Sequence, residues 1–247
     1  FHIVRASWLH SAGARSLGLV NRRSLKRFHS VISVSPAAAS FAKTVFGIDS
    51  VIIPNAVTVK KMRHEPIVEK TPHIVFLGRL VERKGCQYLL AALVQLQRQY
   101  KGAFKVTIAG KGPLLAKLKQ YADKQNLKQV SFGGFIEESD KPALLASADI
   151  AVFPSTGGES FGIVLIEAMA AGSRVVLGGN NVGYQSVLSD HPDLLVDVQN
   201  AKTFANRLQY FLEHPSAREA AARWAKIAIK QYDVDVVGKK LLEQYYG

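Results

Sequence analysis

The chain has few of the residues that form disulfides or bind structural metal ions in small domains. Its 247 residues include one cysteine, Cys86, which excludes an internal disulfide framework, and no Cys and His cluster has zinc-site spacing. The longest apolar run, 163–171, is interrupted by Glu167 and is far shorter than the ~18 residues that span a bilayer. Phe1 lies in what we expect to be a strand, with no charged-then-apolar leader. We expect a cytoplasmic protein, and a fragment or processed product.

Acidic side chains are also scarce, with 19 against 32 Lys and Arg, so the net charge is +13 with neutral histidines. Residues 1–70 carry eleven of the cations and three acids. At helical period the densest cations lie opposite apolar residues: Arg15, Arg22, Arg23, Lys26 and Arg27 against Leu17, Val20, Leu25 and Phe28. Such a helix either faces anionic lipid, as a peripheral contact at the inner face of the plasma membrane, or is a solvated surface helix. Nucleic acid gains no support, because neither interleaved aromatics nor a binding motif accompanies the cations.

The remaining composition is that of a folded chain, with 48% hydrophobic and 21% charged residues. From residue 73 onward, short runs rich in Val, Ile and Phe alternate with amphipathic stretches. Strands are expected at 73–78, 104–109, 130–133, 150–153, 174–177 and 194–196, and helices at 86–100, 113–124, 141–147, 163–171 and 201–212. This alternation predicts an α/β fold, in which a parallel sheet is covered by helices on both faces. The loops that follow the strands would meet at one edge, where such folds bind ligands.

The flanking regions divide the chain further. Residues 1–58 look like a smaller piece of the same kind, and 59–72 form a linker with two prolines and no clear periodicity. The expected elements of the first piece are strands at 2–5, 31–34 and 51–53 and a helix at 37–45. Residues 73–225 form the main domain. The last helices, 226–247, are expected to break near Tyr232 and Asp233.

Three loops that follow predicted strands carry unusual residues. In the first, 78–85, Arg79 and Lys84 flank a turn and can clamp an anion, although a solvated basic loop would look the same. The second, 110–113, is half of a dinucleotide fingerprint and lacks the third glycine, which disfavours a nicotinamide or flavin site. The third, 134–138, could present Ile136 to a flat heterocycle.

The fourth loop, 154–162, is the most informative because it is rich in glycine and runs into a predicted helix. Free backbone N–H groups and the positive end of the helix dipole would form a diphosphate site there. Glu159 precedes the helix, and Glu167 lies about a turn and a half inside it. One carboxylate can therefore reach beyond the phosphates while the other lies at ribose height.

The same loop also contains G-x-S-x-G, the nucleophile elbow of serine hydrolases, at 158–162. Ser160, Asp197 and His214 follow one another in the order of that class. Against it, four residues separate the motif from its strand, and no His-Gly-Gly oxyanion loop lies upstream. His214 is more simply a surface residue at a helix end.

Taken together, the motifs resemble the group 1 retaining glycosyltransferases of GT-B fold (family 4). The ordered set is Val-Ser-Pro (34–36), Ile-Pro-Asn (53–55), Gly-Arg-Leu…Lys-Gly (78–85), Gly-Lys-Gly-Pro (110–113), Ala-Asp-Ile…Pro-Ser (148–155) and Glu-x7-Glu (159–167). The run 157–172 and the initial Phe1-His2 look most like the phosphatidylinositol mannosyltransferases. The resemblance implies two Rossmann-like halves around a cleft, of which 1–58 is the tail of the first and 73–225 the whole second. The last helices would cross back to the first half.

The resemblance also implies roles for individual residues. Four residues would be catalytic: Arg79 and Lys84 would neutralise the departing diphosphate, while Glu159 and His2 would lie at the transferred sugar. The donor-binding residues would be Gly78, Gly110, Lys111, Ile136, Lys141, Phe161, Gly162, Ile163, Val164 and Glu167, of which Glu167 would hold the ribose and Ile136 with Lys141 would line the base pocket. Transfer would proceed by same-face attack of the acceptor hydroxyl, without a protein nucleophile. We expect no cofactor and no metal, because no paired aspartates lie near these loops.

The function expected from these residues is transfer of mannose from GDP-mannose to a membrane lipid such as phosphatidylinositol. A UDP-hexose enzyme for glycolipid or polysaccharide synthesis is the nearest alternative. A nucleotide-binding module that is inactive as a fragment is an alternative of another class, and the serine hydrolase is a remote one. The sequence does not indicate the oligomeric state.

Overall fold

The computed structural model describes residues 28–64 and 70–246. The predicted strand at 2–5, residue His2 and the basic stretch 15–27 therefore lie outside the described residues. Within the described residues, every helix is too short or too polar to cross a membrane.

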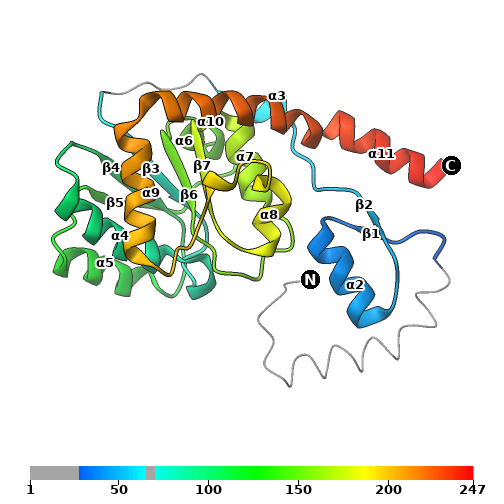
Figure 1. Cartoon of the computed structure of the whole chain (residues 1–247), viewed down its shortest axis with the longest axis horizontal. Helices are drawn as coiled ribbons and strands as arrows, with labels where there is room; N and C mark the ends of the chain where they lie inside the picture. Colours follow the sequence, from blue (N-terminus) through cyan, green and yellow to red (C-terminus); the bar gives the residue numbers. More distant parts are fainter. Residues whose placement is uncertain (1–27, 65–69, 247) are drawn as a thin grey trace.

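The core is a six-stranded parallel sheet with the order β5-β4-β3-β6-β7-β8 (Figure 1). The strands are β3 (His73–Leu77), β4 (Lys105–Ala109), β5 (Val130–Gly134), β6 (Ile150–Phe153), β7 (Val175–Gly179) and β8 (Leu195–Val196). The central strands β3, β6 and β7 are buried almost throughout, as expected for a parallel sheet with both faces covered. All six predicted strands are confirmed, with their ends shifted by two residues or fewer.

Two groups of helices cover the sheet. α4 (Cys86–Gln99) packs against α5 (Leu115–Lys124) and α9 (Ala201–Glu213), whereas α7 (Ile163–Ala171) packs against α6 (Lys141–Ala146) and α10 (Pro215–Ala228). Because parallel crossovers are right-handed, a chain that leaves β3 in one direction and β6 in the other places these groups on opposite faces. The hydrophobic core lies between each group and the sheet.

One helix of the main domain was not predicted. α8 (Val182–Leu188) has seven residues and is capped by the preceding Asn181, whose side chain accepts a hydrogen bond from Tyr184 N at 3.0 Å. A segment this short carries too few turns for apolar periodicity to show. The helix is nevertheless buried along Gly183, Tyr184, Val187 and Leu188.

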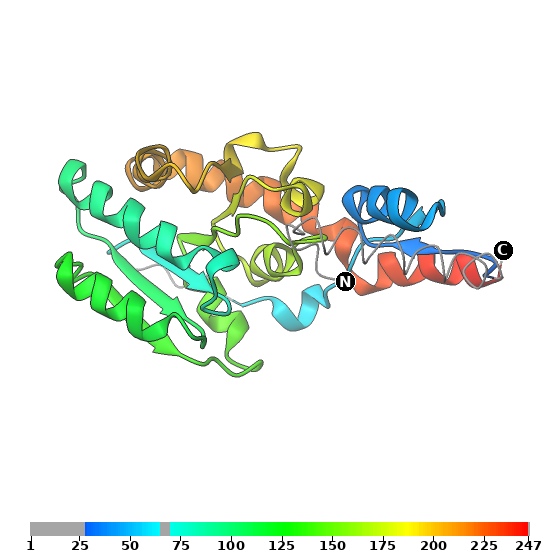
Figure 2. The same cartoon turned by 90° about the horizontal axis from the view of Figure 1, so that it is seen from below.

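The N-terminal piece is a small βαβ unit at the same end of the molecule as α11 (Val234–Tyr246), as Figures 1 and 2 both show. β1 (Ile32–Ser33) pairs in parallel with β2 (Val51–Ile52), and α2 (Pro36–Phe46) connects them. These elements confirm the predicted ones with shorter strands. The side chain of Ser35 caps α2 by accepting from Ala38 N at 3.0 Å, and it also donates to the carbonyl of Ser160. The Val-Ser-Pro motif thus ties this piece to the glycine-rich loop.

Two segments connect the six-stranded domain to the N-terminal piece and to α11, and they lie side by side near Val57 and Tyr232. Val57 N donates to Tyr232 O at 2.9 Å, and Val234 N donates to Val57 O at 3.1 Å. The predicted break in the C-terminal helices is confirmed here, because a 3-10 turn (Ile229–Tyr232) and the extended residue Asp233 separate α10 from α11. The predicted linker 59–72 is more ordered than expected, since it begins with the one-turn helix α3 (Val59–Met62).

Candidate functional site

The strand order indicates where in the fold a ligand would bind. β3 lies beside β6, and the chain runs outward from this pair in both directions, which is the switch point where open parallel sheets bind ligands. A cavity of about 510 Å³ opens at this edge, between the loops that follow β3 and β5 and the start of α7. Seven of the predicted site residues line it: Gly78, Arg79, Lys84, Ile136, Lys141, Val164 and Glu167. Two of the four predicted loops, 78–85 and 134–138, and the helix that follows the fourth loop therefore line one cavity.

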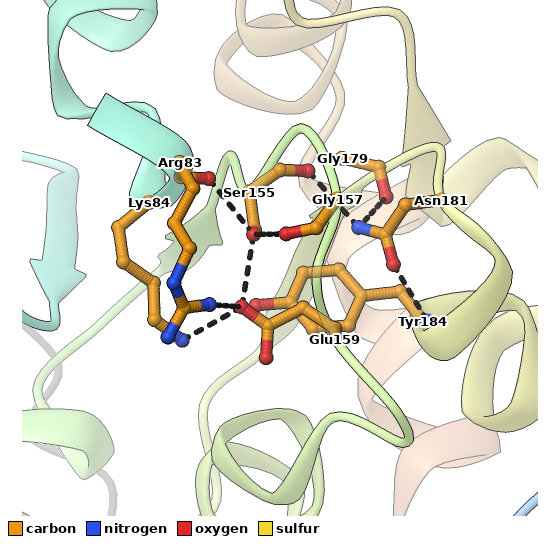
Figure 3. Close-up of polar contacts among 8 residues, drawn as sticks. All are labelled: Arg83, Lys84, Ser155, Gly157, Glu159, Gly179, Asn181 and Tyr184. Atoms are coloured by element: carbon orange, nitrogen blue, oxygen red, sulfur yellow. Dashed lines mark hydrogen bonds and ion pairs between the residues drawn. The ribbon is translucent and has the colours of Figure 1, made fainter. Parts of the chain in front are cut away.

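Glu159 does not itself line the cavity, but two cavity-lining cations from the loop after β3 hold it there (Figure 3). Lys84 Nζ lies 2.8 Å and Arg83 Nη1 2.9 Å from the same oxygen, Glu159 Oε1. All three side chains are mostly buried, with exposed fractions of 20%, 30% and 13% for Lys84, Arg83 and Glu159. Arg83 was not predicted as a site residue. The signal was its place in 78–85, but sequence alone does not tell which of three neighbouring cations points inward.

Ser155 joins the two loops behind these charges. Its hydroxyl lies 2.9 Å from Glu159 Oε1 and 2.9 Å from the carbonyl of Arg83, and Thr156 N donates to the same carbonyl at 3.0 Å. Ser155 is 1% exposed, so these contacts form inside the protein. They fix the Glu159 carboxylate through Oε1, and no described residue forms a hydrogen bond with Oε2.

Asn181 and Tyr184 support the loop from the far side, as Figure 3 shows. Asn181 Nδ2 donates to the carbonyls of Ser155 and Gly179 at 2.9 and 3.1 Å, while its Oδ1 caps α8. Tyr184 is 1% exposed, and its ring lies beside the Glu159 carboxylate and lines the cavity. Burial, and then the negative charge of Glu159, raise the pKa of Tyr184 well above its usual value. The Tyr184 hydroxyl is thus neutral at physiological pH and can donate a hydrogen bond.

The glycine-rich loop ends in the helix that was predicted. α7 begins at Ile163, and Gly162 precedes it with φ +121°, a conformation that L side chains rarely adopt. The first amides of a helix have no partner within it, so this end can accept an anion. Val164 lines the cavity and Ile163 is 49% exposed, whereas Phe161 is buried and packs edge-on against Tyr232 at 5.6 Å. The Phe161 side chain therefore anchors the loop and leaves only its backbone for a ligand.

A second ion pair lies at the other end of the cavity. Lys141 Nζ is 3.1 Å from Glu167 Oε1 and also pairs with Glu138. Burial raises the pKa of Glu167, and the charge and hydrogen bond of Lys141 only partly oppose this effect. Burial alone would lower the pKa of Lys141, but the hydrogen bonds and charges of Glu138 and Glu167 together raise it. Ile136 lines the same end, so an apolar surface lies next to this pair.

Gly110 and Lys111 lie beside the cavity and do not line it. The amide of Gly110 donates to the carbonyl of Gly134, and the carbonyl of Lys111 accepts from Leu80 N at 2.9 Å. The ammonium group of Lys111 lies 4.5 Å from the centre of the Phe135 ring, which is on the cavity wall. In this structure the second predicted loop holds the first and third loops together.

The serine hydrolase arrangement is not formed. His214 Nδ1 lies 2.8 Å from the carbonyl of Tyr210, and its ring stacks on the Tyr210 ring at 4.6 Å. Asp197 accepts a hydrogen bond from Gln199 N at 3.1 Å. The residues that would orient and activate Ser160 thus have other partners. Within residues 28–64 and 70–246, no group of three or more His, Cys, Asp or Glu side chains is placed to hold a metal ion.

Comparison with known proteins identifies the family. The profile of the family described as "Glycosyl transferases group 1" matches residues 58–231, which include every residue that lines the cavity. The chain belongs to the group 1 glycosyltransferases. Its similarity extends beyond the matched segment to whole-chain relatives and to solved structures.

The curated relatives share one kind of name. The phosphatidyl-myo-inositol mannosyltransferase of Mycolicibacterium smegmatis is 33% identical over 96% of this chain and 63% of its own length. The Mycobacterium leprae protein of the same name is 32% identical over 96% of this chain and 65% of its own. A GDP-mannose-dependent alpha-(1-6)-phosphatidylinositol monomannoside mannosyltransferase of Mycobacterium tuberculosis is 29% identical over 78% and 52%. The chain thus spans about two-thirds or less of the length of these group 1 relatives.

Solved structures show the fold. HepE of Anabaena, crystallised with UDP, superimposes with a TM-score of 0.83 at 22% identity, covering 95% of this chain and 67% of that one. A sucrose-phosphate synthase of Thermosynechococcus elongatus gives 0.78 at 23% identity, over 93% and 61%. The fold is of the GT-B type, with a Rossmann-like parallel sheet between layers of helices.

Proposed function

We propose that this group 1 glycosyltransferase transfers mannose from GDP-mannose, with retention of configuration, to a membrane lipid such as phosphatidylinositol. In this proposal residues 73–225 form the donor-binding domain, 1–58 the tail of the acceptor-side domain, and 226–247 the helices that cross back toward it. The names of the relatives support both substrates. The residues around the cavity support the donor half of the proposal most directly.

The observation that carries the proposal is the meeting of cations, a helix start and a carboxylate at the switch point. Arg79, Lys84 and Val164, which is in the first turn of α7, all line the cavity. A diphosphate between them would gain the charge of two cations and the unpaired amides of the helix. Ion pairing of Lys84 with Glu159 keeps the ammonium group in place before the donor binds.

The sugar and the nucleoside would lie at opposite ends of this diphosphate. Glu159 is anchored through Oε1, so its other oxygen can accept hydrogen bonds from hydroxyls of the hexose. At the other end, Glu167 would accept from the ribose hydroxyls and Ile136 with Lys141 would line the base. His2, which lies outside the described residues, is proposed for the opposite wall near the reacting carbon.

The reaction in this arrangement needs no protein nucleophile. The acceptor hydroxyl attacks the anomeric carbon from the face of the departing diphosphate, and the bond between that carbon and the phosphate oxygen breaks. The hydroxyl proton passes to the departing phosphate oxygen. Arg79, Lys84 and the α7 amides stabilise the charge that develops on the phosphate, and Glu159 positions the sugar.

The test is nucleotide binding by the chain, followed by transfer. GDP is expected to raise the Tm, and Lys84→Ala is expected to abolish the shift, whereas Lys117→Ala, which removes an exposed cation from α5, leaves it unchanged. Radiolabelled mannose from GDP-mannose should appear in phosphatidylinositol vesicles. A shift with UDP alone would favour the UDP-hexose alternative. Binding without transfer would leave a nucleotide-binding module, and no shift with either nucleotide would refute the proposal.

A further inference from the structure

A second groove lies away from the donor cavity, where α3 meets α7 and α10. It has a volume of about 320 Å³ and includes Gly172 and Ser173, which follow the C-terminal end of α7, the helix whose N-terminal end faces the donor site. Its floor is apolar and comes from Met169, Ala225 and Ile229. A helix of nine residues separates the two sites, so a ligand in this groove does not contact the donor.

The rim of this groove is strongly basic. Arg63, His64, Lys226 and Lys230 all line it, and all four side chains are exposed. None of them forms an ion pair with a described residue. Two further exposed lysines, Lys60 and Lys61, lie on α3 next to the rim. The surface thus carries five Lys and Arg side chains and one histidine without a neutralising partner among residues 28–64 and 70–246.

Among residues 28–64 and 70–246, two carboxylates near this surface in the sequence, Asp233 and Glu219, have other partners. Asp233 accepts hydrogen bonds from the backbone amides of Val59 and Asp235, at 3.3 and 3.0 Å. Glu219 lies 4.0 Å from Arg223 on the outer face of α10. No carboxylate of the part of the chain that the structure describes therefore neutralises the cations at the rim.

The outer face of α10 adds an apolar group to these charges. Ala221, Ala225 and Ile229 recur every four residues and are buried, so positions 223, 226, 227 and 230 point outward. Ile227 on this face is 69% exposed, between Lys226 and Lys230. A lone exposed isoleucine among lysines gains nothing from water or from a nucleic acid backbone. It can enter the boundary between lipid headgroups and acyl chains while the lysines reach the phosphates.

From this combination we infer that the surface formed by α3 and α10 binds the headgroup phosphates of anionic phospholipids, and that Ile227 inserts below them. The inference does not rest on the proposed transfer reaction, because the surface would bind vesicles even if the chain transferred no sugar. It adds a membrane contact separate from the basic stretch 15–27. The contact also touches both connections between the two ends of the molecule, at Val59 and Lys230.

The experiment places a reporter on α10. Cys86 is buried, and burial raises its pKa to about 12, so a cysteine introduced by Ile227→Cys can be labelled selectively with a polarity-sensitive fluorophore. Vesicles that contain phosphatidylglycerol should shift the emission to the blue. NaCl at about 0.5 M, an ionic strength at which exposed charges are strongly screened, should reverse the shift. Vesicles of phosphatidylcholine and inorganic phosphate alone should leave the emission unchanged.

Two matched controls separate this surface from the rest of the chain. The same label at Tyr121→Cys on α5 should not shift, even if the basic stretch 15–27 brings the protein to the vesicle. Lys226→Ala with Lys230→Ala should weaken the labelled protein's vesicle affinity by about 25-fold, or about fivefold per lysine near an anionic surface. Lys117→Ala with Lys124→Ala changes two exposed lysines of α5. This double variant should weaken the vesicle affinity by less than about twofold, because charges far from the contact are screened.

The inference is overturned by any of three results. These are no blue shift at position 227 with phosphatidylglycerol, an equal shift with phosphatidylcholine, and an equal loss of affinity for the α10 and α5 double variants. A shift caused by RNA but not by vesicles would assign the surface to nucleic acid instead. Far-UV circular dichroism of each variant checks that the helices are retained. GDP binding, measured in parallel, reports on the donor site independently.

Discussion

Lys84 Nζ lies 2.8 Å from Glu159 Oε1, although the two residues follow different strands, β3 and β6. The contact joins the two loops on either side of the switch point before any ligand is present. Because Arg83 and Ser155 share the same carboxylate oxygen, Glu159 has few orientations available. A preformed site loses less side-chain entropy when the donor binds.

The first prediction concerns this carboxylate. Glu159→Gln keeps the shape of the side chain but removes the charge that opposes Arg83 and Lys84. We expect GDP to bind as tightly as before or more tightly, because both cations then act on the diphosphate alone. Mannose transfer should fall about 100-fold, and the free energy of unfolding by about 1–3 kcal/mol, since charged hydrogen bonds are lost.

Calorimetric titration with GDP and radiolabelled transfer check this prediction on the same protein. Glu213→Gln, which changes an exposed carboxylate at the end of α9, should alter neither measurement. A weaker affinity for GDP in Glu159→Gln would mean that Glu159 supports the phosphate site and has no specific role at the sugar.

The second prediction tests the start of α7. A Cβ at Gly162 would lie 2.8 Å from Cδ1 of Tyr184, and φ is +121°. Gly162→Ala should therefore lower the free energy of unfolding by about 2–4 kcal/mol and weaken GDP binding, because the loop must move. Gly238→Ala is the matched control. Nothing lies within 4 Å of a Cβ in the middle of α11, so alanine there should stabilise the protein by up to about 1 kcal/mol. Urea unfolding of both variants measures these changes, and equal stabilities would refute the prediction.

Much of this site could be predicted from the sequence, for physical reasons. Runs of Val, Ile and Phe mark strands that are buried on both faces, and the carboxyl ends of parallel strands must share one edge. Residues on different loops, such as Lys84, Ile136 and Glu167, could therefore be expected in one cavity. The start of α7 at Ile163 was predicted to the residue, because a glycine-rich loop that gives way to an apolar helix has few possible boundaries.

What the sequence did not reveal depends on side-chain direction and on packing between loops. Arg79, Arg83 and Lys84 are close in sequence, and only the turn geometry makes Arg83 a partner of Glu159. Gly110 stays a predicted donor-binding residue, and its contact with the carbonyl of Gly134, which joins two neighbouring loops, had no signal in the sequence. α8 is too short for periodicity, although its cap, Asn181, also holds the carbonyl of Ser155. Such contacts arise between distant segments, so no local pattern encodes them.

The third prediction concerns the only cysteine. Cys86 is fully buried at the first position of α4, and burial raises the pKa of its thiol from 9.0 to about 12. At about pH 8 the native protein should react with Ellman's reagent at least about 100-fold more slowly than the same protein in guanidinium chloride, because the thiolate is the reactive form. Because the folded pKa is the higher one, the neutral thiol stabilises the fold fully below pH 9, and this contribution is lost as the pH rises toward 12. Equal rates in both states would show that the thiol is accessible.

The last prediction separates stability from binding at Glu167. Burial raises the pKa of this carboxyl above its usual 4.5, so the protonated form is favoured in the folded state and the stabilising contribution is lost as the pH rises through the higher folded value. Glu167→Gln, which mimics the protonated form, should therefore be at least as stable as the wild type at pH 7, with the difference shrinking below pH 4.5. It should nevertheless lose the Tm shift caused by GDP. Melting curves recorded from about pH 4 to pH 8, a window that spans the pKa shift of Glu167, measure both effects. A variant less stable at pH 7 would mean that the ion pair with Lys141 outweighs the cost of burying the charge.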